Sequence, residues 1–139
     1  MYVTDTETER INIFSAGSDG NATPSVTMES PHGIVDSCAV AIDSHGQIFV
    51  ANGGGEVEGR GGADYSVTVY PAGSYANVAP IAKLAGAMTA QTGYDDKSGI
   101  SAPQAIAVDA HGRIFIANGV GGYNGQGNIT VYAPGSDGD

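Results

Sequence analysis

One stretch of this sequence occurs twice: "AIDSHGQIFVANG" runs from Ala41 to Gly53, and "AVDAHGRIFIANG" runs from Ala107 to Gly119. When the chain is shifted by 66 positions, residues 34–55 and 100–121 agree at more than half of their positions, which is far above chance. A second stretch recurs three times, as "INIFSAGSDGNATP" from Ile11, "VTVYPAGSYANVAP" from Val67 and "ITVYAPGSDGD" from Ile129. Internal repetition on this scale predicts a fold built from similar units that pack on one another.

Each repeated unit divides into four short segments that are rich in β-branched and aromatic residues and are separated by glycine-containing turns. This composition is typical of β-strands, and good helix formers at helical spacing are scarce. We therefore predict an all-β protein with ten strands in four-stranded antiparallel units. The first strand of the unit is 38–43 and 105–109, the second is 47–52, 113–118 and 2–5, the third is 66–71, 11–15 and 129–133, and the fourth is 80–86 and 24–30.

The residue types within these segments predict local roles. The first strand is small and apolar throughout, which fits a strand packed on both faces, so Cys38 is expected to be buried. In the turn that follows, Asp43 and Asp109 are expected to bond their own backbone, and Gly46 and Gly112 to adopt positive φ. The residues expected to form inter-strand or inter-unit contacts are Phe49, Val69, Ile114 and Ile116, and Phe115 at the repeated position.

The pattern "P-x-x-IAVD-x-x-G-x-IFVAN" resembles the NHL-repeat group and the wider six-bladed, TolB-like β-propellers. The resemblance covers nearly the whole chain but carries no catalytic residue, and the first unit has Ser37 where the second has Pro103. It implies one β-repeat domain over residues 1–139, formed of four-stranded propeller-type blades. The expected blades are a partial one over about 2–30, a full one over about 38–86 and a partial one over about 104–133.

Ten strands make about two and a half blades, whereas closed propellers use about 4 to 8. An incomplete propeller exposes apolar sheet faces and unpaired strand edges, and both are stabilised when another sheet or strand covers them. We therefore expect either self-association or the missing blades of a longer chain. Because the two ends differ, self-association would be head-to-tail and would give a ring or a filament.

The net charge of −10 limits the possible partners. Nucleic-acid binding needs a basic surface, so no nucleic-acid partner is expected. No segment is apolar for long enough to span a bilayer, and the N-terminus does not resemble a signal peptide. The family resemblance nevertheless favours an extracellular or periplasmic location. Asn21 in "NAT" and Asn128 in "NIT" match the glycosylation pattern, without deciding whether it is used.

The variable segments predict where a binding site lies. The turns between first and second strands are short and nearly invariant, whereas the loops between second and third strands, and the crossovers between units, are long and different. These variable loops are expected at one end of the sheets, and function concentrates in such loops. The candidate binding residues are His32, Asp36, Glu56, Glu58, Arg60, Asp64, Tyr94, Asp95, Asp96, Tyr123 and Asn124.

Two hypotheses remain for the function. The resemblance extends to propeller hydrolases, lactonases and lyases, some of which bind a metal at this end, so it implies that His32, Asp36, Asp95 and Asp96 could bind Ca²⁺ or another divalent cation. However, no catalytic set can be assembled, and the alanines expected to line a central channel supply no ligand. His45 and His111 lie in the invariant turns and are interpreted as turn residues. We therefore favour a non-catalytic binding, structural or self-assembly module that needs no cofactor, with a fragment of a metal-dependent enzyme as the alternative.

Overall fold

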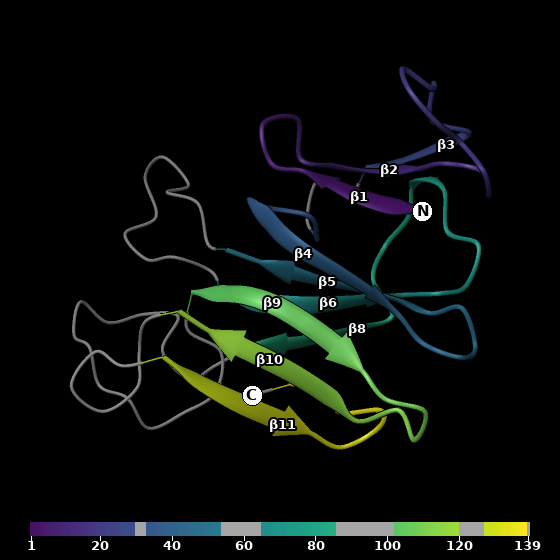
Figure 1. Ribbon diagram of the computed structural model, residues 1–139. Helices are drawn as coiled ribbons and strands as arrows, with labels where there is room; N and C mark the ends of the chain where they lie inside the picture. Colours follow the sequence, from purple (N-terminus) through teal and green to yellow (C-terminus); the bar gives the residue numbers. More distant parts are fainter. Residues whose placement is uncertain (30–32, 54–64, 86–101, 120–126, 139) are drawn as a thin grey trace.

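The chain forms three β-sheets that are stacked in chain order (Figure 1). The structure, a computed structural model, describes residues 1–29, 33–53, 65–85, 102–119 and 127–138, and these residues form eleven strands and no helix. The prediction of an all-β fold is thus confirmed. All ten predicted strands are present, with bounds that differ from the predicted ones by at most two residues at either end.

The middle sheet is the most complete one. It contains β4 (Ser37–Ile42), β5 (Ile48–Asn52), β6 (Ser66–Tyr70) and β8 (Ala82–Ala85), in that order and with every neighbouring pair antiparallel. The third sheet repeats the first three of these strands as β9 (Pro103–Val108), β10 (Ile114–Asn118) and β11 (Asn128–Tyr132).

The first sheet has β1 (Tyr2–Asp5), β2 (Arg10–Ile13) and β3 (Val26–Glu29), which pair antiparallel and correspond to β5, β6 and β8. A two-residue strand that the sequence did not predict, β7 (Ala76–Asn77), pairs parallel with β3. β7 directly follows β6 of the middle sheet in the chain. Its pairing with β3 therefore joins the first and middle sheets through the backbone, in addition to the side-chain packing between them.

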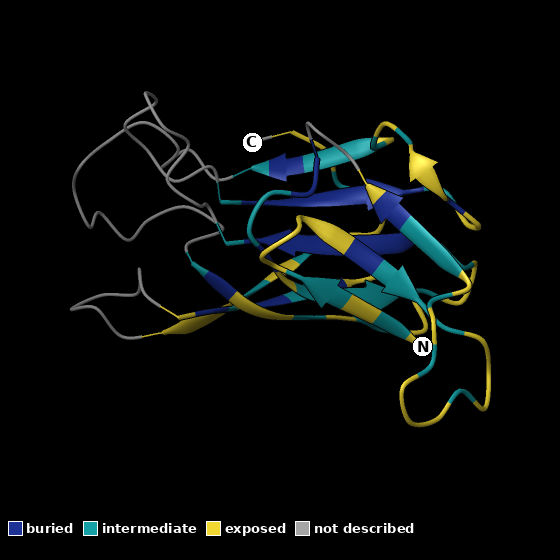
Figure 2. Ribbon diagram, turned by 90° about the horizontal axis from the view of Figure 1, so that it is seen from above, coloured by how far each residue is buried: buried dark blue, intermediate teal, exposed yellow. Residues whose placement is uncertain are grey.

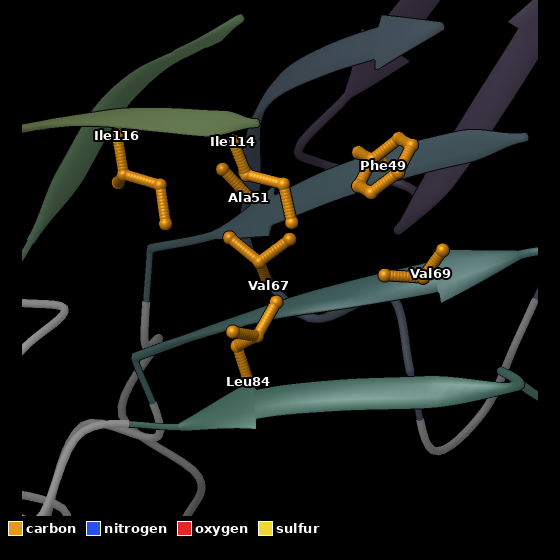
Figure 3. Close-up of a cluster of buried hydrophobic side chains, with 7 residues drawn as sticks. All are labelled: Phe49, Ala51, Val67, Val69, Leu84, Ile114 and Ile116. Carbon is orange, nitrogen blue, oxygen red and sulfur yellow. The ribbon is translucent and has the colours of Figure 1, made fainter. Parts of the chain in front are cut away.

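Two apolar layers hold the three sheets together. Between the first and middle sheets, Ile11 and Met28 pack with Ile48, Val50 and Tyr70, all 0 % exposed. Between the middle and third sheets lies the second layer (Figure 3), whose buried members are Phe49, Ala51, Val67, Val69, Leu84, Ile114 and Ile116. The expected core positions of Phe49, Val69, Ile114 and Ile116 are therefore confirmed.

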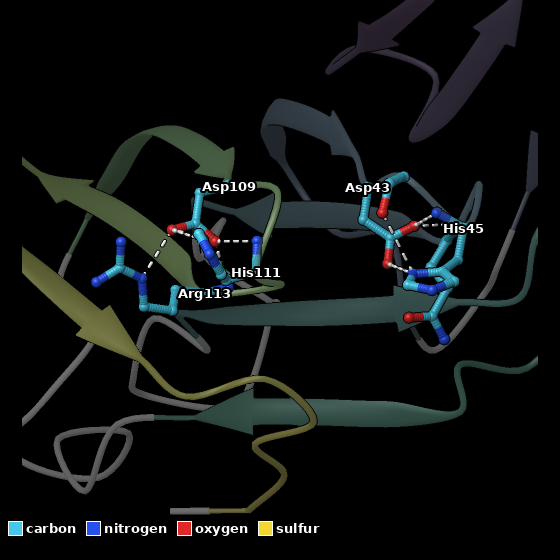
Figure 4. Close-up of polar contacts among 7 residues, drawn as sticks. Asp43, His45, Asp109, His111 and Arg113 are labelled. Carbon is cyan, nitrogen blue, oxygen red and sulfur yellow. Dashed lines mark hydrogen bonds and ion pairs between the residues drawn. The ribbon is translucent and has the colours of Figure 1, made fainter.

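The repeated hairpin turn is built by one aspartate and one glycine in each copy (Figure 4). Asp43 Oδ1 accepts hydrogen bonds from the backbone N–H groups of His45 (2.9 Å) and Gln47 (2.8 Å), and Gly46 has a φ of +81°. Asp109 makes the same pair of bonds, to His111 and Arg113, each at 2.9 Å. The predicted turn roles of Asp43 and Asp109 are confirmed, and so is the predicted positive φ of both glycines.

Replacing Gly46 with alanine is expected to destabilise the fold by about 1–2 kcal/mol, because an L-residue at positive φ places its Cβ against the backbone. The new Cβ would also lie 3.1 Å from that of Ala72. Gly17→Ala is the matched control, since Gly17 has a φ of +78° but no neighbour within 4 Å of the added carbon. Urea unfolding should show a larger loss for Gly46→Ala, and equal losses would mean that contact with Ala72 contributes nothing.

Two expectations for side-chain burial are wrong. The first strand is packed on both faces in β4, where Ala39 and Ala41 contact one apolar layer and Val40 and Ile42 the other, but not in β9, where the alanines at 105 and 107 are exposed and no described sheet covers them. Cys38 is exposed rather than buried, since it lies at the register shift between β4 and β5. Phe115 is only half-buried, unlike Phe49, and its ring lies 5.6 Å from the guanidinium carbon of Arg113.

Candidate functional site

The strands that lead into the variable loops end side by side. In the middle sheet, Ser37, Asn52, Ser66 and Ala85 are neighbours across consecutive strands. In the third sheet, Asn118 likewise lies opposite both Pro103 and Asn128. The strand ends that flank 54–64, 86–101 and 120–126 therefore lie at one end of their sheets, as the sequence predicted.

Most of the candidate binding residues lie outside the described residues, and only Asp36 is described. Its φ is +48°, and its carbonyl accepts a hydrogen bond from Gly53 N–H at 2.9 Å. Ala102 at the repeated position has a φ of +44° and accepts the same bond from Gly119 at 3.0 Å. Because alanine performs the same backbone role, this conformation does not depend on the Asp36 carboxylate. The candidates whose structure is not described are His32, Glu56, Glu58, Arg60, Asp64, Tyr94, Asp95, Asp96, Tyr123 and Asn124.

A buried polar network beneath this end holds the chain that enters the middle sheet. The Asn52 side chain is fully enclosed: Oδ1 accepts from Val35 N–H at 3.1 Å, and Nδ2 donates to Gly33 O, Ser66 Oγ and Thr68 Oγ1, each at 3.2 Å. The Thr68 hydroxyl also donates to Gly33 O at 2.6 Å. The sequence repeats this asparagine as Asn118, but no role was predicted for it. The sequence signal for this network is an asparagine at the end of one strand, Asn52, together with hydroxyl residues on the next strand, Ser66 and Thr68.

The two turn histidines point into solvent, and their side chains lie at separate turns, so they do not converge on a common site where both could bind one ligand (Figure 4). The side chains of His45 and His111 are 83 % and 84 % exposed. Partial burial raises the pKa of Asp109, but hydrogen bonds from Arg113 and His111 outweigh it, so the pKa lies below its ordinary value. The stabilisation from these bonds is present at neutral pH and is lost as the pH falls through that lowered pKa. No group of three or more His, Cys, Asp or Glu residues within the described ranges could hold a metal ion.

The thiol of Cys38 is poorly suited to nucleophilic chemistry. Although the residue as a whole is exposed, its sulfur lies against the carbonyl oxygens of Ala51 and Pro103, and this partial desolvation raises the pKa of the thiol, with the nearby Asp36 acting in the same direction. The reactive form of cysteine is the thiolate, so a raised pKa keeps the group in its unreactive form at neutral pH.

The outer face of the third sheet presents an exposed apolar surface, as the sequence predicted for a terminal sheet. Figure 2, which colours the chain by burial, shows that some strand positions are exposed while others are buried. Ile129 and Val131 are 69 % and 55 % exposed, whereas Val67 and Val69 at the repeated positions are 0 % and 5 % exposed. In the middle sheet this face is covered by Ile114 and Ile116. The exposed alanines and half-buried Phe115 extend the same surface. We call Ala105, Ala107, Phe115, Ala117, Ile129 and Val131 the terminal apolar face.

A loop that occurs three times follows the third strand of each unit, and its second and third copies contact the preceding sheet. We call residues 15–21, 71–77 and 133–138 the clasp loops; in each, a serine N–H bonds back three residues, at 3.2–3.3 Å. Gly20, Ala76 and Gly138 occupy the same place in the three loops, and all have positive φ. The second loop reaches β3 as β7. The third reaches β8, where Leu84 pairs with Gly138 and Lys83 N–H donates to Asp137 Oδ1 at 3.0 Å.

The described part of the chain contains no helix that is long and apolar enough to cross a membrane. Comparison with models of known protein families finds none that matches this chain, and comparison with curated proteins finds no match either.

Proposed function

We propose that this chain is a non-catalytic β-propeller repeat segment, similar to the NHL-repeat and six-bladed TolB-like propellers, that acts as a binding or structural module. In this proposal the three sheets are propeller-type blades, and the chain works by packing further blades against its two terminal sheets. The repeated strand order and the repeated use of one sheet face support the proposal.

The observation that carries the proposal is the difference between two equivalent strands. β6 reads "SVTVY" and is buried at every position, whereas β11 reads "NITVY" and has no buried residue. Burying an Ile or Val side chain contributes roughly 1.5–3 kcal/mol. A sheet that covered Ile129 and Val131 as the third sheet covers Val67 and Val69 would therefore gain several such contributions.

The opposite terminal surface makes the contact head-to-tail. The outer face of the first sheet exposes Met1 and Val3, at 65 % and 40 %, and differs from the terminal apolar face. A contact between two different surfaces is heterologous, and it closes into a ring or continues as a filament. A second copy of the chain thus supplies the covering sheet in the simplest assembly.

We expect the 139-residue chain to run as an oligomer of its 13.9-kDa unit in size-exclusion chromatography with light scattering. Association should strengthen as salt is added, because the charge of −10 on each copy opposes contact and is screened within about 10 Å at 0.1 M salt. Ile129→Lys should shift the distribution towards monomer, since it places an ammonium group in the contact.

The matched control is Ile81→Lys, which changes the charge equally at an apolar residue that is 55 % exposed and lies immediately before β8 of the middle sheet. It should leave association unchanged. A monomeric wild-type chain with a cooperative thermal transition at both salt concentrations would refute the proposal, and so would equal effects of the two lysine variants.

The alternative of a metal-dependent hydrolase, lactonase or lyase gains no support from the described residues. Of its four candidate ligands only Asp36 is described, and its backbone role is shared with Ala102. Tightly held stoichiometric metal in the purified protein would favour this alternative. We therefore retain the module as the proposal.

A further inference from the structure

Both copies of the repeated hairpin end on an asparagine that is followed by glycine, as Asn52–Gly53 and Asn118–Gly119. In an Asn-Gly pair, the backbone nitrogen of the glycine can attack the side-chain carbonyl carbon of the asparagine. Glycine hinders this attack least, because it has no Cβ. The two asparagines are only 2 % and 4 % exposed, so the fold encloses two pairs that are reactive in an open chain.

The fold occupies the nucleophile of each pair. Gly53 N–H donates to the carbonyl oxygen of Asp36 at 2.9 Å, and Gly119 N–H donates to that of Ala102 at 3.0 Å. Attack on the asparagine requires the glycine nitrogen to lose this proton and to turn towards the side chain, which breaks the bond. Both glycine nitrogens are therefore held in an unreactive arrangement while the structure is closed.

The amide that must leave is held as well. Asn52 Nδ2 donates to Thr68 Oγ1 at 3.2 Å. In the third sheet, Asn118 Nδ2 donates to Thr130 Oγ1 at 3.2 Å and to Asn128 Oδ1 at 2.8 Å. A threonine at the equivalent strand position thus holds the amide in both copies, and the reaction requires the amide to leave these acceptors.

The product does not fit the closed structure. Deamidation puts a carboxylate oxygen where Asn52 Nδ2 lies, 3.2 Å from Gly33 O, and neither oxygen can donate a hydrogen bond. A buried charge without a partner is strongly unfavourable. In the isoaspartyl form the main chain also gains a methylene group at Asn52, the residue that pairs with both Ser37 and Ser66. The reacted chain therefore cannot restore the same pairing.

We propose that Asn52–Gly53 and Asn118–Gly119 are latent deamidation sites, which react only when the loop-bearing end of their sheet opens and which then prevent that end from closing again. The bond from the glycine nitrogen to the asparagine Cγ forms, the Cγ–Nδ2 bond breaks, and ammonia leaves with the proton of the glycine nitrogen. Water then hydrolyses the succinimide ring to a carboxylate, without oxidation or reduction. Each event adds one negative charge to the net charge of −10. The inference does not rest on the proposed self-association.

The first measurement compares deamidation in the folded chain and in the chain unfolded by guanidinium chloride, at the same mildly alkaline pH and the same temperature. Peptide mapping by mass spectrometry reads Asn52 and Asn118 separately. Both should react more slowly in the folded chain, by about tenfold or more, because local opening exposes only a minor fraction of the molecules at any time. Equal rates in the two conditions would overturn the proposal.

Two matched variants test whether the local network controls each site. Thr68→Val removes an acceptor of the Asn52 amide, and Thr130→Val removes the equivalent acceptor of the Asn118 amide. Each variant should accelerate deamidation of its own asparagine in the folded chain by about threefold to tenfold, as expected for the loss of a buried hydrogen bond, and leave the other unchanged. Both variants should react like the wild type in guanidinium chloride.

The reciprocal design makes every outcome decisive. Equal acceleration of both asparagines by either variant would mean that the sites react through global unfolding, which overturns control by local opening. No acceleration, or no reaction at all in the folded variants while the unfolded chain reacts, would also overturn the proposal. Circular dichroism of the two variants confirms that each comparison is made on folded chains.

A substitution that supplies the product carboxylate tests whether the reaction prevents closing. Asn52→Asp should lower the melting temperature by several degrees or abolish the cooperative transition, because the new charge faces Gly33 O in a buried network. Asn21→Asp is the control, since it adds the same charge at an exposed asparagine. Equal melting temperatures of the two variants would show that the closed sheet accommodates the product, contrary to the proposal.

Discussion

Replacing Phe49 with alanine is expected to lower the free energy of unfolding by about 3–5 kcal/mol. The ring is only 5 % exposed and lies in the apolar layer between the middle and third sheets, with Val69 beside it on β6 (Figure 3). Removing it opens a cavity lined by two sheets, which neighbouring β-strands can fill only in part. Urea unfolding followed by circular dichroism measures the loss.

Phe115→Ala is the internal control, because Phe115 occupies the repeated position in the third sheet. Its ring is half-buried and belongs to the terminal apolar face, where no described sheet covers it. Its truncation should therefore cost clearly less than that of Phe49 in the monomer. Equal losses at low protein concentration would show that the third sheet is covered after all, and no loss at Phe49 would refute the packing of the middle sheet.

Replacing Asn52 with leucine should be the second severe change. Leucine fits the volume but cannot accept from Val35 N–H, and a buried polar group left without a partner costs about 1–3 kcal/mol. Leucine also cannot donate to Gly33 O, which then keeps only its bond from the Thr68 hydroxyl. The loss falls on the connection between residues 33–35 and the middle sheet, so limited proteolysis should detect faster cleavage there along with the reduced stability in urea.

A double-mutant cycle with Thr68→Val tests whether the network acts as one unit. Thr68 Oγ1 donates to Gly33 O and accepts from Asn52 Nδ2, so the two side chains share a partner. Residues in one hydrogen-bond network show coupling of about 0.5–3 kcal/mol. Strictly additive losses would mean that the two side chains support the sheet independently, contrary to the contacts described.

The sequence determined the strands and the hairpin turns because the interactions that form them are local. Asp43 bonds backbone groups two and four residues ahead, and Gly46 needs only its own φ, so the repeated "D-x-H-G" pattern predicts the turn without reference to the rest of the chain. Alternation of apolar residues likewise predicted which side chains of β6 share a face. The candidate loops were located at one end of the sheets by strand direction alone, although their side chains lie outside the described residues.

The tertiary structure alone decided which of these equivalent faces are covered. Val67 and Ile129 occupy equivalent positions in nearly identical segments, yet the first is buried and the second is exposed, because the third sheet covers Val67 and no described sheet covers Ile129. The exposed position of Cys38 arises from a register shift that no periodicity signals. The pairing of β7 with β3 joins residues 48 positions apart through two residues, too few for a pattern. Local hydrogen bonds and alternation are encoded in neighbouring residues, whereas contacts between sheets depend on how distant segments pack.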